Sequence, residues 1–532
     1  MLRKAFIEFS VLSLFLSLLL TIGINFDLVK AVNHSYSGTY VGGIIWENTT
    51  WTLENSPYII MKTVQIPENV TLIIEPGVTV IASPSLPERE FLFVFAGKIY
   101  AHGASDSKIT FDGGGKNGFF GHVSYDRPTA LLSLKHCIIK NGSFLIWPES
   151  GGYGCYLELK YSEIVGITRG SDIPIWHSNQ DIFIEQNIFV DSAGFRFASS
   201  VSSVYIKNNL FIGCRPGVYG ALIVNWYCGS GGATIVKYNS FIGAKNVLSL
   251  PEGYFNAAII ATENYWGTTD TGVIDSMIYD KKDNIKCSSF IEYLPILTEP
   301  HPNTPTLPLI VKFTYLPTTV YEFGKVTFDA SASFGLYSSI VNYTWDFGDG
   351  NITTTSSPKV EYCYATPGNY DVTLIVTDEF GFRNSTTMSI TVLEDNVSPV
   401  TMDYYGGGWC NKDFTVTLTA TDHESGIADT YYRINNGPIK AVSIHGHPRI
   451  TTEGANNTLE YWGVDNAGNE EAHKILTGIK LDKTAPSSSI SFDGVLGENG
   501  WFVSDVTVRL TASDGLSGVD SIIYSFNNVE WK

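Results

Sequence analysis

The chain has 532 residues, 44% of them hydrophobic and only 16% charged, with a formal net charge of −19 at pH 7. This length allows three or four domains, and 50 glycines beside so few charged residues indicate a β-rich, turn-rich protein rather than a helical bundle. The acidic balance argues against nucleic acid and anionic lipid as partners, because both are bound through basic surfaces.

An export signal is predicted at residues 1–31. Two basic residues near the start precede an apolar run, residues 11–24, and Val29 with Ala31 forms a small-residue cleavage pattern. The run is shorter than the roughly 20 residues that span a bilayer, so cleavage near Ala31 is favoured over a retained N-terminal anchor. No later stretch is apolar enough to span a membrane. We therefore expect a secreted or cell-surface protein, and its nine N-x-S/T sequons make it a candidate glycoprotein.

A segment of about 25 residues recurs between residues 131 and 268. It reads L-E-L-K-Y-S-E-I-V-G from Leu157 and I-F-I-E-Q-N-I-F-V-D from Ile182. Aligning the copies places six residues in one column, at steps of 25, 25, 22, 30 and 25: Cys137, Ser162, Asn187, Asn209, Asn239 and Asn264. Each copy holds a short alternating strand, a corner and a second apolar pair, and none can bury its apolar face alone. Stacking the copies buries those faces, which predicts a parallel β-solenoid.

The asparagines of this column are predicted to form a structural ladder. Asparagine suits a tight corner because it tolerates left-handed backbone angles, and stacked amides can bond from one turn of the solenoid to the next. We therefore expect Asn187, Asn209, Asn239 and Asn264 to superpose. The alternative, a coincidental recurrence in a β-sandwich, fits the irregular spacing less well.

The stretch resembles the right-handed parallel β-helix family of exported proteins. The similarity extends upstream to S-P-Y-I-I-M-K-T-V-Q from Ser56, which looks like the entry turns of that family. It ends near E-N-Y-W-G from Glu263, which is similar to a corner close to the end of many such helices. The resemblance implies an all-β fold with a right-handed parallel β-helix over residues 45–297. Its motifs concern the fold and not an activity.

Alternation also separates inward from outward residues. The interior is predicted to hold Leu157, Leu159, Ile182, Ile184, Val204, Ile206 and Val236. One outward column is charged: Lys135, Lys160, Glu185, Lys207 and Lys237. A second outward column is apolar: Phe183, Tyr205, Ile235 and Ile260. An exposed apolar column is either covered by a loop or used for binding; a covering loop is favoured, and contact with glycan or protein is the alternative.

Catalysis by the solenoid is not favoured. Glycoside hydrolysis needs two carboxylates about 5–9.5 Å apart, so acids in one column of neighbouring turns would qualify. No such column is present, because Glu158 is followed by Phe183 and Glu185 lies between two lysines.

The chain has seven cysteines, so at least one has no partner within the chain. Cys214 and Cys228 bracket a short Gly-rich loop and are the first disulfide candidate, and Cys137 with Cys155 is the second. No pair has the spacing of a zinc site.

A Pro-rich linker is predicted at residues 298–308, followed by an all-β module at 309–394. The motif W-D-F-G-D-G from Trp345, with Y-D-V-T-L-I-V-T-D after it, resembles the PKD domain, an immunoglobulin-like sandwich in which Trp345 would be the buried anchor. Asp346 and Asp349 are weak Ca²⁺ candidates, although structural turns are preferred for both. No other cofactor and no other metal site is predicted.

Two further segments, residues 397–484 and 485–532, repeat each other. Five residues recur after 92 positions: Trp409, Asp422, Ser425, Gly426 and Tyr432 return as Trp501, Asp514, Ser517, Gly518 and Tyr524. The segments resemble the Ig-like repeats of prokaryotic surface proteins, which implies tandem β-sandwiches. The second copy stops about halfway, so we expect the chain to be a fragment of a longer product.

All these motifs concern turns and cores. We therefore expect a non-catalytic secreted or cell-surface protein whose β-helix serves adhesion, contacting a glycan or a cell-surface protein, and whose sandwiches are spacers. The alternative is a β-helix polysaccharide lyase or glycoside hydrolase with accessory sandwiches. A third candidate is a surface-layer subunit.

Overall fold

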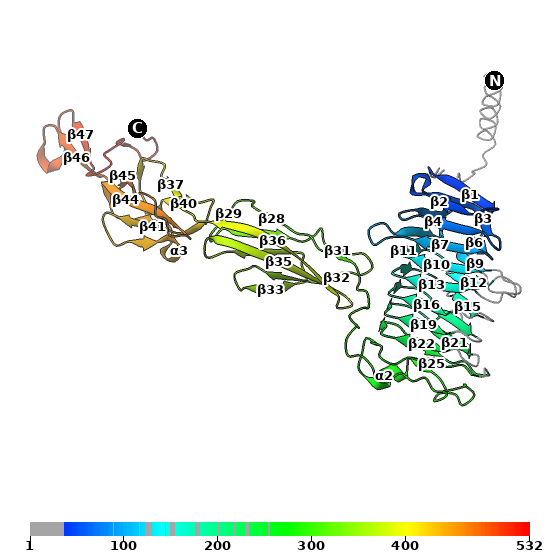
Figure 1. The fold of residues 1–532 in the computed structure, drawn as a ribbon. Coiled ribbons are helices and arrows are strands. Elements are labelled where there is room, and N and C mark those ends of the chain that lie inside the picture. Colours follow the sequence, from blue (N-terminus) through cyan, green and yellow to red (C-terminus); the bar gives the residue numbers. More distant parts are fainter. Residues whose placement is uncertain are drawn as a thin grey trace, which may run out of the picture. The chain divides into compact units, whose positions relative to one another are not determined.

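The structure is a computed structural model. It describes residues 37–532 except Arg89, Lys116, 123–129, Phe144, 149–154, Gly170, 176–180, 200–202, 218–219, 229–232 and 254–255. The predicted export signal therefore lies outside the described residues. The chain divides into two compact units, residues 1–306 and 307–532, and strands dominate both (Figure 1). None of the described helices is long and apolar enough to cross a membrane.

The described residues between 37 and 306 form three sheets of parallel strands. Sheet 1 has nine strands among the described residues, in the order β2 (Thr49–Trp51), β4 (Thr71–Ile74), β7 (Lys98–His102), β10 (Leu131–Lys135), β13 (Tyr156–Lys160), β16 (Ile182–Glu185), β19 (Val204–Lys207), β22 (Thr234–Lys237) and β25 (Ile259–Ile260). The copies of the sequence repeat pair in constant register, so that Leu132 lies opposite Leu157 and Ile182 opposite Val204.

Sheet 2 lies on the path β12 (Ile146–Pro148), β9 (Gly118–His122), β6 (Phe91–Phe95), β3 (Tyr58–Ile66), β5 (Thr79–Ala82), β8 (Ile109–Asp112), β11 (Cys137–Lys140), β14 (Glu163–Val165), β17 (Ile188–Val190), β20 (Leu210–Ile212) and β23 (Ser240–Ile242), and β1 (Thr39–Ile44) pairs with β3. Sheet 3 contains β15 (Ser171–Ile175), β18 (Phe195–Ser199), β21 (Ile223–Cys228), β24 (Leu248–Ser249) and β26 (Ile278–Tyr279). Two short helices, η1 (Leu53–Asn55) and α2 (Thr271–Asp275), complete the described elements of this unit.

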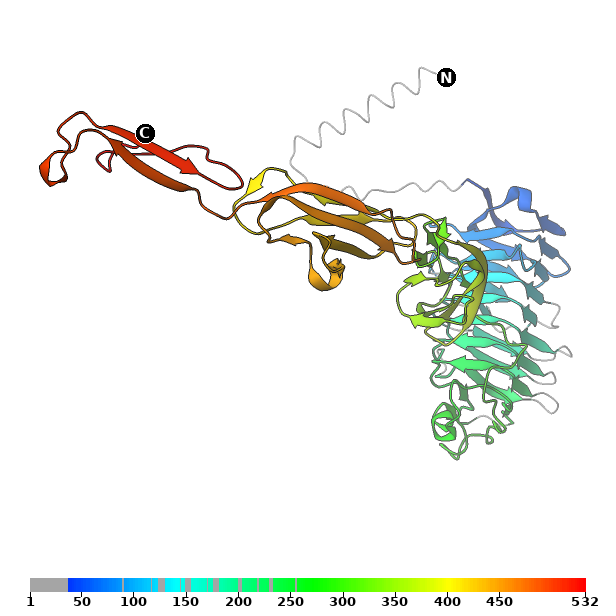
Figure 2. The ribbon, with the colours of Figure 1, turned by 90° about the vertical axis from the view of Figure 1, so that its left-hand side faces the viewer.

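From β13 to β24 the chain visits the three sheets in turn. It runs through β16 in sheet 1, β17 in sheet 2 and β18 in sheet 3, and then returns to sheet 1 with β19. Each circuit therefore places a strand beside its counterpart from the previous circuit, which is why all the pairings are parallel. Figures 1 and 2 show the resulting stack, coloured from blue to green.

The interior of the stack is apolar. All seven residues predicted to point inward are at most 1% exposed. In sheet 2, aromatic rings follow one another from turn to turn, with centroids 4.7 Å apart between Phe189 and Phe211 and 5.1 Å apart between Phe211 and Phe241. Trp266 continues the row at 5.2 Å. Such pairs add packing energy to the burial of large side chains.

The four asparagines of the repeat lie in a buried ladder. The side-chain Oδ1 of Asn209 accepts hydrogen bonds from the backbone N and from Nδ2 of Asn187, at 3.0 and 2.9 Å. Asn239 receives the same two bonds from Asn209, and Asn264 receives them from Asn239. Each amide nitrogen also donates to a strand carbonyl, as Asn209 does to Ile184 at 2.8 Å. Because all four side chains are fully buried, these bonds satisfy polar groups that water cannot reach.

The expected reason for asparagine at this corner was wrong in one respect. The left-handed backbone angle belongs to the residue before each ladder position. These residues have φ between 53° and 61°: Tyr161, Gln186, Asn208, Tyr238 and Glu263. The ladder asparagines themselves do not have positive φ. Asparagine is needed for its amide, which must point inward, while the neighbouring residue makes the bend.

The predicted disulfides are not formed. Cys137, Cys155 and Cys214 are free and buried, and the Cys214 thiol donates to the carbonyl of Phe189 at 3.4 Å. The six-residue strand β21 separates the corner that holds Cys214 from Cys228. At about 3.3 Å per residue this strand spans more than the roughly 7 Å that a disulfide allows between Cα atoms.

The buried thiols should be chemically silent in the native protein. Burial raises the pKa of Cys137, Cys155 and Cys214 to about 12, so hardly any reactive thiolate exists at pH 8. Iodoacetamide should alkylate the exposed Cys363 in native protein, and these three only after denaturation without a reductant. Peptide mapping by mass spectrometry gives the order. A Cys214 that is labelled only after a reductant is added would restore the disulfide prediction.

The last turn of the stack is covered by the segment that follows it. Ala261 N donates to the Glu292 carbonyl at 2.7 Å, and Glu263 N to the Pro295 carbonyl at 2.6 Å. Leu297 N returns a bond to the Asn264 carbonyl at 2.9 Å. These three backbone groups of the final edge therefore have partners within the same chain.

Residues 307–532, all of which are described, begin with a β-sandwich. Its strands are β27 (Leu309–Ile310) with β31 (Phe334–Gly335); β28 (Thr314–Leu316), β30 (Lys325–Asp329) and β34 (Lys359–Cys363); and β29 (Val320–Tyr321), β36 (Arg383–Leu393), β35 (Gly368–Asp378), β32 (Ile340–Asp346) and β33 (Ile352–Thr355). Trp345 is fully buried in the core, edge-on to Phe313 with centroids 5.2 Å apart.

A second sandwich follows, and then a hairpin. The sandwich contains β37 (Val400–Tyr404) with β40 (Thr417–Thr421); β38 (Trp409–Cys410), β45 (Lys474–Leu481), β44 (Gly454–Asp465), β41 (Ile427–Ile434) and β42 (Lys440–Ala441); and β39 (Phe414–Thr415) with β43 (Arg449–Ile450), plus the helix α3 (Val442–His445). The hairpin pairs β46 (Ser487–Asp493) with β47 (Thr507–Ser513) and includes η2 (Glu498–Gly500).

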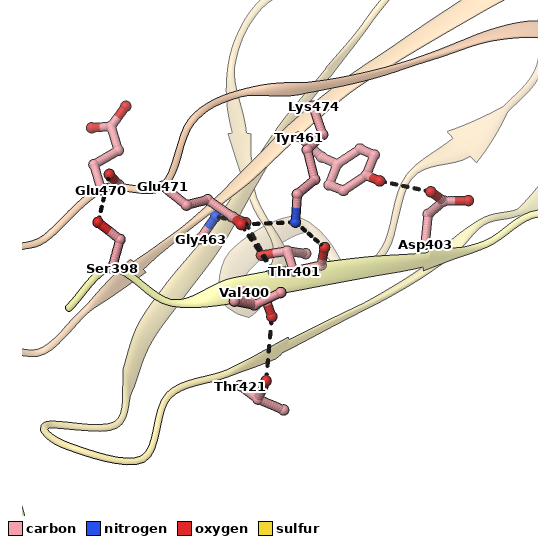
Figure 3. Close-up of polar contacts among 10 residues, drawn as sticks. All are labelled: Ser398, Val400, Thr401, Asp403, Thr421, Tyr461, Gly463, Glu470, Glu471 and Lys474. Atoms are coloured by element: carbon pink, nitrogen blue, oxygen red, sulfur yellow. Dashed lines mark hydrogen bonds and ion pairs between the residues drawn. The ribbon is translucent and has the colours of Figure 1, made fainter.

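A polar network fixes strand β37 on its sandwich (Figure 3). Thr401 N donates to both carboxylate oxygens of Glu471 at 3.0 Å, and Gly463 N donates to one of them at 2.8 Å. Lys474 Nζ bonds the Thr401 carbonyl at 2.6 Å and Glu471 at 2.9 Å. Burial alone would raise the pKa of Glu471, but these donors outweigh it and lower the pKa. The carboxylate therefore stays ionised and holds the start of β37 in place.

Candidate functional site

Four residues of sheet 1 make one outward-facing column, here called the outward strip: Phe183, Tyr205, Ile235 and Ile260. They lie opposite one another in consecutive strand pairs. Phe183, Tyr205 and Ile235 keep part of their surface exposed, and Ile260 is 36% exposed. The parallel register of the stack therefore brings together apolar side chains that are 22, 30 and 25 positions apart in the sequence.

The two aromatic rings of the strip stack on each other. Their centroids are 5.3 Å apart and their planes differ by 9°, close to the spacing of neighbouring strands. The ammonium of Lys160 lies 5.0 Å from the Phe183 centroid, and that of Lys207 lies 4.6 Å from the Tyr205 centroid. Such cation–π contacts contribute about 0.5–1 kcal/mol at exposed sites. The strip thus presents ring edges and aliphatic carbon, bordered by positive charge.

The charged column runs beside the strip in the same strands. Lys160 bridges Glu158 at 3.2 Å and Glu185 at 3.1 Å, and Lys135 meets Glu158 at 2.9 Å. Burial alone would raise the pKa of Glu158, but the bonds from Lys135, Ser133 and Lys160 lower it. Glu158 is therefore an ionised partner of two lysines, which is unlike a general acid, whose pKa must be raised.

A covering loop over the strip stays a prediction. Phe183, Tyr205 and Ile235 are partly buried and Ile260 is 36% exposed, so all four retain some exposed surface. The segment that does return to the stack packs on the adjacent corner: the His301 ring lies 4.6 Å from that of Tyr238, and Thr304 Oγ1 donates to the Tyr238 carbonyl at 2.7 Å. Sequence alternation identified the column but held no information on where this segment packs.

A groove of about 510 Å³ lies between that segment and the corner. Of the acidic residues, only Glu163 lines it in the described part of the chain, and Glu163 is buried and ion-paired with Lys108. This groove therefore lacks the two facing carboxylates that glycoside hydrolysis requires.

The two weak Ca²⁺ candidates form turns. Asp346 accepts a bond from Gly348 N at 3.0 Å. Asp349 accepts bonds from Asn351 N at 3.0 Å and from the Tyr362 hydroxyl at 2.5 Å. Their carboxylates are thus occupied by local donors in the tight loop after Trp345.

Residues 310–392 match the family described as the PKD domain, which confirms that resemblance. Over 104 residues, 19% of its length, the chain is 38% identical to Pre-pro-metalloprotease PrtV of Vibrio cholerae serotype O1 (strain M66-2). Over 150 residues, 27% of its length, it is 28% identical to Collagenase ColA of Clostridium perfringens (strain 13 / Type A). These matches span only 11% and 13% of the two relatives.

A crystal structure of the PKD1 domain from Vibrio cholerae metalloprotease PrtV is also similar to part of the chain. The match has 28% sequence identity and a TM-score of 0.14 over the whole chain, and it covers 16% of this chain and 95% of that domain. The family match and this crystal structure both concern a PKD domain.

Proposed function

We propose that this is a secreted or cell-surface protein whose residues 45–297 form a right-handed parallel β-helix used for adhesion. The outward strip is the contact surface, and a glycan or a cell-surface protein is the partner. The PKD domain and the Ig-like repeats at 397–484 and 485–532 act as spacers that carry this surface. No catalytic step is part of the proposal.

The observation that carries the proposal is the part-exposed strip itself. Large exposed apolar patches often mark contact sites, and Tyr205 is of the residue type that dominates contact surfaces energetically. Ionised lysines along one side give the strip a polar border, an arrangement common to protein contact sites.

The strip can be tested by Tyr205→Ala. The substitution removes a part-exposed ring, so we expect binding to weaken at least about tenfold, equivalent to roughly 1.4 kcal/mol, while the melting temperature stays nearly unchanged. Binding is measured on a glycan array and on immobilised cell-surface extracts. Ile73→Ala is the matched control, because Ile73 belongs to the same sheet column, is 45% exposed and lies outside the strip.

Unchanged binding by Tyr205→Ala, or equal loss in the Ile73 control, contradicts the proposed surface. A reducing-sugar assay against a panel of polysaccharides tests the rival function separately. Release of sugar by the purified chain would favour a polysaccharide lyase or glycoside hydrolase.

A further inference from the structure

Three carboxylates of residues 307–532 converge where the PKD domain joins the next sandwich. Asp395 lies in the segment after β36, Asp422 in the loop after β40, and Asp465 at the end of β44. One oxygen from each lies within 4.8 Å of the others. We call these residues the acidic triad. The segments that supply them are far apart in sequence, so the fold itself assembles the group.

The triad contains a buried oxygen with no partner. Asp395 is 3% exposed, and its Oδ2 has no hydrogen-bond donor. Its Oδ1 accepts a bond from Val397 N at 2.9 Å, so the carboxylate is held in one orientation with Oδ2 left free. A buried charged oxygen without a partner lowers the stability of the fold. The oxygen in question belongs to a carboxylate of the acidic triad.

No positive side chain neutralises the triad. In residues 307–532, all of which the structure describes, no lysine, arginine or histidine forms an ion pair with any of the three carboxylates. Like charges that are buried together repel one another. No positive side chain of residues 307–532 therefore balances the three carboxylates by an ion pair.

The surrounding loops hold the carboxylates in position. Asp422 Oδ1 accepts bonds from the backbone N of Ser425 and Gly426 at 2.9 and 2.7 Å. Asp465 accepts bonds from both nitrogens of Asn469, whose Nδ2 also donates to the Asp395 carbonyl. Downstream of Asp395, the Glu471 network pins the start of β37 (Figure 3). The oxygens are thus prearranged rather than free to spread apart.

The turn that Asp395 forms at the start of its joint recurs at Asp482, at the start of the next repeat. Asp395 opens D-N-V-S-P and Asp482 opens D-K-T-A-P. Each accepts a bond from the N of the residue two positions on, and Asp514 binds Gly518 N as Asp422 binds Gly426 N. Asp482 also contacts the loop of Asp514 through Ser517 N at 2.9 Å. A recurring joint of this kind indicates a function for the acidic residues at domain boundaries.

We propose that the acidic triad binds a Ca²⁺ ion that fastens the PKD domain to the sandwich after it. Oxygen-only ligands select a hard cation. Ligand oxygens about 2.4 Å from Ca²⁺ lie no more than about 4.8 Å apart, as observed for the triad. Ca²⁺ accepts irregular sets of carboxylates, backbone carbonyls and water, whereas Mg²⁺ demands near-octahedral geometry and retains more water. The expected affinity is that of extracellular modules, with Kd about 0.1–1 mM.

Asp395→Asn removes the negative charge while keeping the hydrogen bond that holds the side chain in place. Asparagine keeps the Oδ1 that binds Val397 N and places an uncharged amide at the unpartnered position. In EGTA, we expect this variant to be at least as stable as the parent chain. In about 10 mM CaCl₂, the melting transition of the parent should rise by about 4 °C, and that of Asp395→Asn by less than about 1 °C. Asp422→Asn, which also keeps its acceptor oxygen, should behave in the same way.

The control is Asp346→Asn, in the exposed turn of the PKD domain. It removes one acidic charge and keeps the Gly348 bond, so the response to CaCl₂ should be that of the parent. Calorimetric titration of the EGTA-treated full chain with CaCl₂ measures binding directly. The proposal is overturned if the parent binds no Ca²⁺ up to about 10 mM, if Asp395→Asn retains the binding heat, or if only Asp346→Asn loses it.

Discussion

Asn209→Ala is expected to lower the free energy of unfolding of residues 1–306 by about 3 kcal/mol. The substitution removes the acceptor for Asn187 N and the donor for the Ile184 carbonyl. Both groups are then buried without partners, and each unsatisfied group costs about 1–3 kcal/mol. The bond from Asn209 N to Asn239 can persist, so the damage is limited to the two turns that Asn209 joins.

Hydrogen exchange in increasing urea, followed on peptides from residues 182–242, measures the effect. Asn303→Ala is the matched control, because Asn303 lies in the same unit and is exposed. The control should change stability by less than about 0.5 kcal/mol. Equal stability of the Asn209 and Asn303 variants would mean that the ladder contributes nothing to the stack.

Gly194→Ala is the second substitution for which we expect a large loss. A Cβ atom at this position would lie 1.9 Å from the carbonyl oxygen of Leu222 and 2.4 Å from its carbonyl carbon. The obstacle is the backbone of the next turn, which strand pairing holds in place, so no side-chain rotation can relieve it. Forcing the turns apart should cost about 3 kcal/mol.

Gly217→Ala provides the comparison. Its Cβ would meet nothing closer than 3.5 Å, and its backbone angle is one that alanine accepts. We expect it to stay within about 0.5 kcal/mol of the parent chain. The melting temperature and the yield of soluble protein are measured for both variants and for the parent chain. A Gly194 variant as stable as the Gly217 variant would show that the turns are not packed this closely.

The repetitive part of the fold was the most predictable. A period of two within strands and a period near 25 between them determine which side chains point inward and which share a column, so Phe183 and Tyr205 could be placed side by side from sequence alone. The disulfide prediction failed because closeness in sequence was taken for closeness in space. Cys228 is the last residue of β21, whereas Cys214 lies at the corner after β20.

The acidic triad could not be found by the same reasoning. Its members come from three loops that no period connects, and only Asp422 belonged to the recurring set. The signal that was available is the pairing of Asp422 with Asp514 together with the D-x-x-x-P joints that begin at Asp395 and Asp482. Convergence of these loops depends on how the two sheets of the sandwich pack, which local sequence does not encode.

The bonds that the segment Glu292–Leu297 makes to the final turn have a consequence for self-association. A stack of parallel strands could recruit another copy through its last open edge and grow into a filament, since each added turn presents the same unpaired groups again. Here the chain folds back on part of that edge, so the backbone groups of Ala261, Glu263 and Asn264 that bond to it are not available to another copy.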